Sequence, residues 1–187
     1  QINLLFGENP NKAVRDWTRP FNEAGIQTHM LERGLSGIRM TPVPADVRRL
    51  MFQVKKKQGT DIARSFDGLN DPRNLELSIK YAKEAGMISQ ASLSLTVSPV
   101  HTVEYFTNLA DTLVEMGAEE ISIKDMAGIL KPYAAFELVS RLKQVLDIPV
   151  HMHCHATAGL STAAIVKAVE AGIDNVDTSI SSMSMTY

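Results

Sequence analysis

Only one cysteine occurs among the 187 residues, so no disulfide can form within the chain. This scarcity of thiols makes the reducing cytoplasm the expected location. No apolar run approaches the roughly 18 residues of a membrane-spanning helix, and the N-terminus has no signal-peptide pattern. The formal net charge is −2, which argues against binding to nucleic acid. These absences favour a globular protein that neither spans a membrane nor binds nucleic acid.

Length and hydrophobic content favour a single domain over residues 1–187. Hydrophobic residues make up 44% of the chain, which is normal for a globular protein with a sizeable core. The only basic run covers residues 55–57 and is interpreted as a solvated helix face. Because the first residue is Gln rather than Met, the sequence suggests a processed or excised piece.

Helical and strand patterns alternate along the chain. Helices are expected over residues 11–22, 47–58, 74–84, 102–116, 132–146 and 162–171. Strands are expected over residues 26–31, 61–66, 90–97, 120–124, about 149–155 and 175–180. A strand start about every 25 to 35 residues, with one helix in between, predicts parallel strands joined by right-handed crossovers.

Six such strands fit either an open doubly wound sheet or part of an eight-stranded barrel. No glycine-rich phosphate-binding motif follows any strand, which weakens a dinucleotide-binding sheet. Five polar side chains fall at or just past the C-terminal ends of the strands: Arg33, Asp67, Lys124, His153 and His155. In a (β/α)8 barrel this rim carries the chemistry. The pattern therefore predicts an α/β fold of the TIM barrel type, short of the usual length of about 250 residues by about two βα units.

Three of the five histidines stand at alternate positions of one strand: His151, His153 and His155. Alternate residues of a strand point to the same face, with Met152 and Cys154 on the other. Two imidazoles spaced in this way can hold a divalent metal. The alternative is a polar strand end whose histidines bind backbone groups or water.

Lys124 follows apolar residues of a strand that is expected to be buried. A buried ammonium is costly unless it is paired. Three interpretations are open: an ion pair with Asp125 or another carboxylate, a Schiff-base nucleophile with a lowered pKa, or a lysine that has taken up CO2. A carbamate is anionic, so it would supply an oxygen ligand beside a metal on His153 and His155.

The segments 123–132 (IKDMAGILKP), 153–159 (HCHATAG), 66–74 (FDGLNDPRN), 98–102 (SPVHT) and 177–184 (DTSISSMS) resemble the biotin-dependent carboxyltransferase domain. That family includes pyruvate carboxylase, the oxaloacetate decarboxylase alpha subunit and the pyruvate-acting transcarboxylase subunit. The resemblance covers nearly the whole chain. It implies a (β/α)8 barrel of which this chain holds roughly strands three to eight.

The resemblance also implies a site and a reaction. Lys124, as a carbamate, together with His153 and His155 would hold zinc, manganese or cobalt. Arg33 would bind the carboxylate of pyruvate or oxaloacetate and take part in catalysis, while Asp67 binds the substrate or orients its neighbours. The reaction would transfer a carboxyl group between the keto acid and carboxybiotin. A biotin carrier domain or subunit and further copies of the chain are the implied partners.

Several family features have no counterpart here. The metal-binding aspartate of an Arg-Asp-Ala-x-Gln-Ser motif, both opening strands, the proton-shuttling threonine and the C-terminal helices do not occur in the sequence. Ser36 and Met40 replace an asparagine and a tyrosine. Two alternatives therefore stand beside the carboxyltransferase: a Schiff-base aldolase or lyase that uses Lys124, and a non-catalytic fragment or scaffold.

Overall fold

The computed structural model describes residues 6–37 and 41–180. A single sheet of six parallel strands runs in the order β1-β2-β3-β4-β5-β6. The strands are β1 (His29–Glu32), β2 (Ile62–Ser65), β3 (Ile88–Ser94), β4 (Glu120–Asp125), β5 (Val150–Cys154) and β6 (Asn175–Val176). The helices are α2 (Pro10–Glu23), η1 (Gly34–Ser36), α3 (Ala45–Lys57), α4 (Pro72–Glu84), α5 (Val103–Glu115), α6 (Pro132–Val145) and α7 (Ser161–Glu170).

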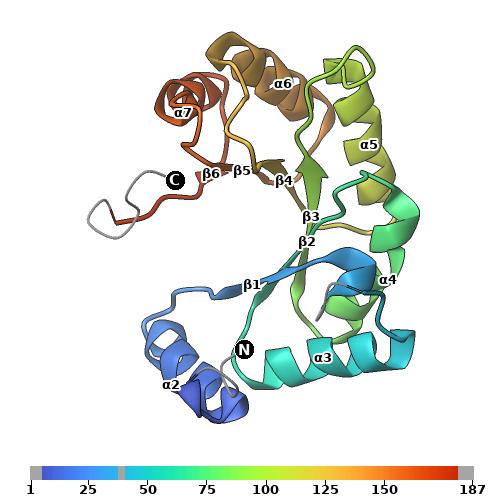
Figure 1. The fold of residues 1–187 in the computed structure, drawn as a ribbon, viewed down its shortest axis with the longest axis vertical. Helices are drawn as coiled ribbons and strands as arrows, with labels where there is room; N and C mark the ends of the chain where they lie inside the picture. Colours follow the sequence, from blue (N-terminus) through green and yellow to red (C-terminus); the bar gives the residue numbers. More distant parts are fainter. Residues whose placement is uncertain (1–5, 38–40, 181–187) are drawn as a thin grey trace.

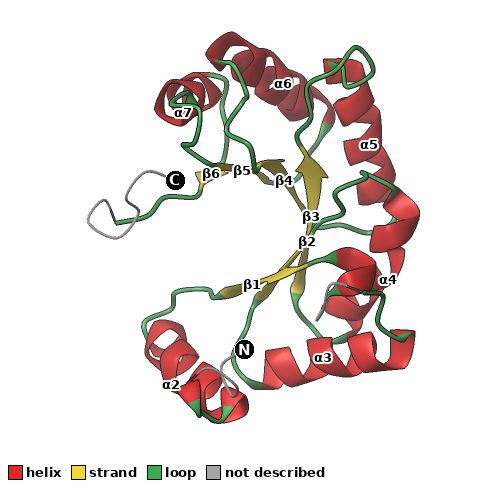
Figure 2. Cartoon of the chain, in the orientation of Figure 1, coloured by secondary structure: helices red, strands yellow, loops and turns green. Residues whose placement is uncertain are grey.

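Each strand pairs with the next strand in the chain, so the sheet has no point at which the strand order reverses. A doubly wound sheet requires such a reversal. Figure 1 shows the sheet curving with the helices on its convex side, and Figure 2 shows the gap between β1 and β6 on the opposite side. This confirms the predicted partial (β/α)8 barrel and excludes the doubly wound alternative.

Two strand boundaries differ from the expectation. The strand predicted from residue 26 begins at His29, because Ile26 belongs to the end of α2. Its N–H donates to the Phe21 carbonyl at 2.8 Å, and Gly25 has a φ of 74° and donates to the Asn22 carbonyl at 3.0 Å, which is a Schellman helix end. The last strand stops at Val176 rather than at residue 180, because its ladder with β5 covers only two residues.

The apolar core lies between the sheet and the helices. In β4, Ile121 and Ile123 are fully buried in the main apolar cluster. The alternating positions on the same strand are Glu120, Ser122 and Lys124, which face the inside of the barrel because side chains alternate along a strand. On this strand the convex face is thus apolar and the concave face polar. Among the described residues, no helix has both the length and the hydropathy to cross a membrane.

Candidate active site

The ends of β4 and β5 bring the predicted lysine and histidines together. Lys124 lies directly opposite His153 in the parallel ladder, and Asp125 lies opposite Cys154. His155 follows the last residue of β5, and its backbone N–H donates to the Asp125 carbonyl at 3.0 Å. The His153 and His155 rings meet edge to face with their centroids 5.0 Å apart. The two imidazoles therefore share the inner face, as their spacing predicts.

His153 has one ring nitrogen bound and the other free. Nδ1 lies 2.7 Å from Oδ2 of Asp177, and because an ionised carboxylate can only accept, Nδ1 carries the proton. Nε2 is buried and has no hydrogen-bond partner among the described residues. A neutral imidazole oriented by a carboxylate, with its remaining lone pair directed into a site, is the usual arrangement of a metal-binding histidine.

Asp177 also pairs with Arg64 from the other side of the barrel. The Arg64 guanidinium binds both carboxylate oxygens: Nη2 lies 3.0 Å from Oδ1, and Nη1 contacts Oδ2. Burial tends to raise the pKa of Asp177, but the hydrogen bonds and charges of His153 and Arg64 outweigh it and hold this pKa well below its usual range. The carboxylate is thus permanently ionised at neutral pH and orients His153.

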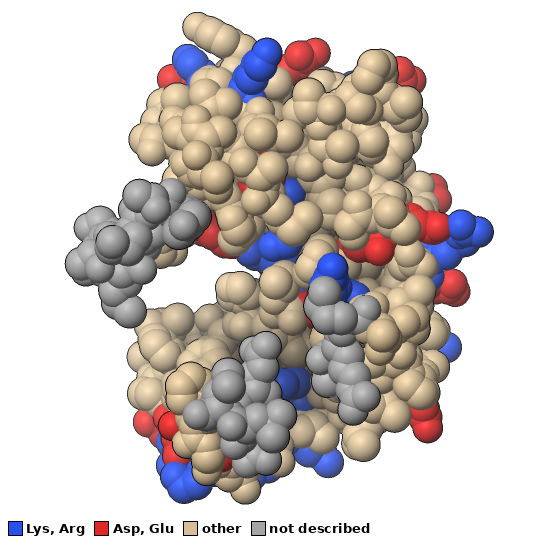
Figure 3. All heavy atoms as spheres, viewed as in Figure 1, with Lys and Arg blue, Asp and Glu red and all other residues tan. Residues whose placement is uncertain are grey.

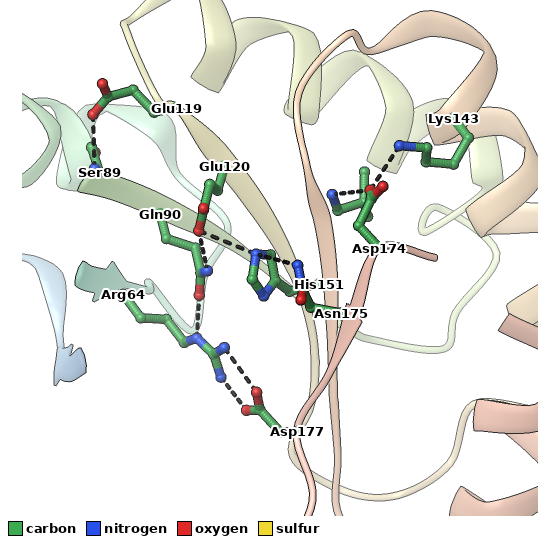
Figure 4. Close-up of polar contacts among 11 residues, drawn as sticks. Arg64, Ser89, Gln90, Glu119, Glu120, Lys143, His151, Asp174, Asn175 and Asp177 are labelled. Atoms are coloured by element: carbon green, nitrogen blue, oxygen red, sulfur yellow. Dashed lines mark hydrogen bonds and ion pairs between the residues drawn. The ribbon is translucent and has the colours of Figure 1, made fainter. Parts of the chain in front are cut away.

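A chain of polar side chains continues from Arg64 across the inner face of the sheet (Figure 4). Arg64 of β2 bonds Gln90 of β3, and Gln90 donates to Oε2 of Glu120 on β4 at 2.7 Å. Nε2 of His151 lies 3.1 Å from the same Glu120 oxygen. Burial tends to raise the pKa of Glu120, but the hydrogen bonds from His151 and Gln90 lower it overall. His151 is therefore held below the rim, away from the lone pair of His153.

Lys124 is 4% exposed and forms no ion pair with any described residue. Its Nζ lies over the Phe66 ring, 5.1 Å from the centroid. Burial, and then the charge of Arg64, lower its pKa, while Asp177 opposes the shift. The amine is therefore more easily deprotonated than an ordinary lysine, which both the carbamate and the Schiff-base interpretations require.

Asp125 does not pair with Lys124, so this alternative from the sequence is wrong. Its carboxylate accepts the backbone N–H groups of Ile129 at 3.1 Å and Leu130 at 2.8 Å, and Cys154 donates to it at 3.4 Å. A side chain at Gly128 would collide with the backbone carbonyl of His155. Asp125 therefore ties the loop after β4 against the loop that begins with His155.

Arg33 and Asp67 line a separate hollow of about 440 Å³ at the ends of β1 and β2. His153 and His155 line another, of about 180 Å³, together with Asp177. Oδ2 of Asp67 accepts hydrogen bonds from the Asp71 backbone N–H at 3.0 Å and from Nδ2 of Asn74 at 3.2 Å. Figure 3 shows the molecule hollowed between its two ends, with basic side chains along the floor. The expected site residues thus fall into two groups along one rim.

The described residues contain no group of three His, Cys, Asp or Glu side chains suited to hold a metal. The His153 and His155 rings lie together at this rim, beside the buried Lys124. Among the described residues, Nε2 of His153 has no hydrogen-bond partner and Lys124 forms no ion pair. Met40, which departs from the family, and residues 181–184, which form part of the sequence resemblance, lie outside the described residues.

Sequence reasoning assigned no role to Arg64, Gln90, Glu120 or Asp177. One signal was available for Arg64, a lone charge inside a strand whose neighbours Ala63 and Ser65 are small. Asp177 follows a strand, as the other rim residues do, and belongs to one of the segments that carry the resemblance. Nothing in the sequence, however, shows that these two side chains meet across the barrel.

A parallel βα barrel whose rim carries paired imidazoles, a buried lysine and an arginine belongs to the class of TIM-barrel enzyme domains. The model of the HMGL-like family matches residues 51–183, and the chain belongs to this family.

The relatives make the family assignment more specific. The chain is 40% identical over 178 residues to a pyruvate carboxylase subunit of Methanocaldococcus jannaschii, covering 95% of this chain and 31% of that protein. It is 37% identical over 183 residues to the methylmalonyl-CoA carboxyltransferase 5S subunit of Propionibacterium freudenreichii, covering 97% and 36%.

Among solved structures, the carboxyl transferase domain of Rhizobium etli pyruvate carboxylase with pyruvate and biocytin matches with a TM-score of 0.93 and 32% identity, covering 99% of this chain and 32% of that one. The predicted resemblance to carboxyltransferase domains is confirmed. The chain spans about a third of the length of these curated relatives.

Proposed function

We propose that this chain forms the metal-binding part of a biotin-dependent carboxyltransferase domain. The reaction transfers a carboxyl group between oxaloacetate or pyruvate and biotin. The relatives named pyruvate carboxylase and carboxyltransferase support this reaction, as does the solved domain with pyruvate and biocytin. The observation that carries the proposal is the His153 ring, which lies on the strand position opposite Lys124. Asp177 binds its Nδ1, whereas its buried Nε2 has no hydrogen-bond partner among the described residues.

We assign His153, His155 and a carbamylated Lys124 as metal ligands. Imidazole and carboxylate-type oxygen together suit zinc, manganese or cobalt. Bound there, a divalent cation would supply Lewis-acid polarisation of the oxygens of a keto acid. The chain's own contribution is to hold His153 in one tautomer through Asp177 and Arg64, and to exclude bulk water from Lys124.

The carbamate forms when the neutral Lys124 amine attacks the carbon of CO2. A new N–C bond forms, one C=O pair moves onto oxygen, and the nitrogen loses a proton to solvent. The lowered pKa of Lys124 increases the fraction of neutral amine that this step needs. The product carries a negative charge, which the positive charge of the neighbouring Arg64 stabilises. The same charge disfavours the ammonium form of Lys124.

Arg33 is proposed to bind the carboxylate of the keto acid, since a guanidinium fork matches two carboxylate oxygens. It lines the 440 Å³ hollow together with Asp67. Because one oxygen of Asp67 holds its own loop through Asp71 and Asn74, we assign Asp67 to shaping this hollow, where it borders the bound substrate. Arg33 then sets the orientation of the substrate toward the metal ligands.

The remaining expectations follow from the relatives and the composition. Biotin would arrive as carboxybiotin on a carrier domain or subunit, and assembly into homo-oligomers is expected. The single cysteine favours a reducing cytoplasmic environment.

Metal content and oxaloacetate decarboxylation test the proposal together. We expect stoichiometric divalent metal in the purified protein, and its loss in His153→Ala and His155→Ala. His101→Asn is the matched control, because His101 bonds Ser98 on a loop after β3 and does not take part in the site. A wild-type protein that binds no divalent metal at any concentration, or a His155→Ala variant with unchanged metal content, would overturn the proposal.

The two alternatives are not favoured by the named relatives, and each has a direct test. Borohydride treatment in the presence of pyruvate would label Lys124 only if a Schiff base forms. Carbon-13 NMR after incubation with labelled bicarbonate would show a carbamate signal that is lost in Lys124→Arg. A scaffold without catalytic function would give neither signal and no decarboxylation.

A further inference from the structure

Glu32 is the last residue of β1 and directly precedes Arg33. It is 1% exposed, although it is a carboxylate. Met30, on the same face of the strand, packs against the apolar cluster of Phe52, Ala63, Ala82 and Met87. Glu32 therefore points away from the inside of the barrel and into the layer of helices. Its backbone position places the following Arg33 at the rim.

The Glu32 carboxylate binds the loop that carries Arg33. Its Oε2 accepts the backbone N–H of Gly34 at 3.0 Å. A Cβ at position 37 would lie 2.6 Å from its Oε1, so the backbone of Gly37 passes directly over the carboxylate. The loop that begins with Arg33 is thus wrapped around one side chain, on which both Gly34 and Gly37 converge.

Two helices hold the same carboxylate from behind. Nη2 of Arg48 on α3 lies 3.5 Å from Oε1 of Glu32 and 2.5 Å from Oγ of Ser78 on α4. The Arg48 and Glu32 side chains are 1% and 0% exposed. The loop after β1 is therefore connected to α3 and α4 through one buried ion pair and one hydroxyl.

Packing alone does not require the Glu32–Arg48 pair to be charged. A buried ion pair costs desolvation free energy, and well-packed apolar residues of similar volume are often as stable or more so. An apolar pair would leave the Gly34 N–H without its acceptor, however, and would leave the loop unattached. The feature that only the charged pair supplies is the position of the loop.

We infer that Glu32, held by Arg48 and Ser78, is the positioning residue that sets the orientation of Arg33 for the carboxylate of the keto acid. This inference rests on the proposed function for the role of Arg33, but the attachment of the loop is independent of it. Glu32 does not touch the substrate, and it acts through the backbone of residues 33–37.

The test replaces the ion pair without leaving a lone charge, in the double variant E32L/R48M. This variant keeps the volume of both side chains in the helix layer, so we expect it to fold, with a melting temperature lowered only by the lost acceptor of the Gly34 N–H. We expect the KM for oxaloacetate to rise about tenfold or more, because small displacements of a substrate-binding group are costly, while kcat falls much less. Amide hydrogen exchange in a peptide that covers residues 32–37 should become faster.

The matched control is Arg49→Met. Arg49 lies next to Arg48 on α3 and joins the same two helices through a 2.8 Å ion pair with Glu84 on the surface. It should change neither the KM nor the exchange of residues 32–37. A general loosening of α3 against α4 would affect both variants alike.

The outcomes separate the inference from the proposed function. A folded E32L/R48M with unchanged KM and unchanged exchange overturns the inference while the function stands. A wild-type protein that neither binds nor decarboxylates oxaloacetate overturns the function, and the exchange result then decides alone whether Glu32 holds the loop. If E32L/R48M does not fold, Glu32→Gln provides the same two readouts, because its amide keeps one acceptor oxygen and replaces the other, which faces either the Gly34 N–H or Arg48, by a donor.

Discussion

Oδ2 of Asp177 lies 2.7 Å from Nδ1 of His153, and the same carboxylate is bound by the guanidinium of Arg64. This contact joins the residue that follows β6 to the His153 ring, which we assign as a metal ligand. It leaves Nε2 of His153 as the only ring atom that can donate a lone pair. In the proposed metal site, the control of metal affinity would lie on a residue that does not itself touch the metal.

Replacing Asp177 by Asn should weaken metal binding about 10- to 100-fold, because an amide no longer fixes the tautomer of His153 and carries no charge. Metal titration followed by elemental analysis measures this directly. Asp174→Asn is the control, since Asp174 precedes the same strand but binds Lys143 and the Val150 N–H. Equal metal affinity in the Asp177 and Asp174 variants would contradict the assigned role.

Replacing Gly34 by Ala should destabilise the protein by about 1–3 kcal/mol. Gly34 has a φ of 49°, and its Cβ would lie 3.2 Å from the backbone carbonyls of Phe66 and Asn74. Urea unfolding measures the loss. Gly68→Ala is the control, because Gly68 lines the hollow beside Arg33 and a Cβ at this position meets nothing within 4 Å. It should change stability much less, and equal losses would refute the explanation.

The stability of the protein should depend on pH through Glu32. Burial, opposed by Arg48 and by hydrogen bonds, raises the pKa of Glu32 above its ordinary 4.5. A raised pKa in the folded state means that the contribution of this group is fully present below the unfolded pKa. It is lost as the pH rises through the folded value.

In E32L/R48M this dependence is absent. The free energy of unfolding of the variant, relative to wild type, should therefore increase from about pH 4 to about pH 7. Denaturant titrations of both proteins at the two pH values provide the measurement. A constant difference would show that Glu32 titrates normally in the folded state, and a difference that decreases with pH would show that its pKa is lowered there; either result contradicts the prediction.

Cys154 should react slowly with iodoacetamide in the folded protein. Burial, and then the charge of Asp125 and the hydrogen bond to it, raise the pKa of this thiol to about 12. Because the thiolate is the nucleophile, alkylation at neutral pH should be at least about 100-fold slower than in the urea-unfolded chain. Mass spectrometry over time follows the reaction, and similar rates in both states would show that the thiol is exposed.

Most elements of the fold were predictable because their signals are local. The helix over residues 132–146 and the strand over residues 120–124 appear as α6 and β4 with boundaries within a residue. The start of β1 could not be predicted, because Ile26 and Gly25 complete the end of α2. Their backbone N–H groups donate hydrogen bonds to the carbonyls of Phe21 and Asn22. An apolar residue that closes a helix has the same local pattern as one that begins a strand.

The alternation of histidines along one strand was enough to place His153 and His155 on one face, since strand geometry alone determines it. The surroundings of Lys124 could not be predicted in this way, because Asp125, its neighbour in sequence, points to the opposite side and binds its own loop. Arg64 and Asp177 are 113 residues apart in the chain and meet only because the sheet curves into a barrel. Local periodicity thus specified the elements and the rim, whereas the curvature of the sheet selected which charges pair across it.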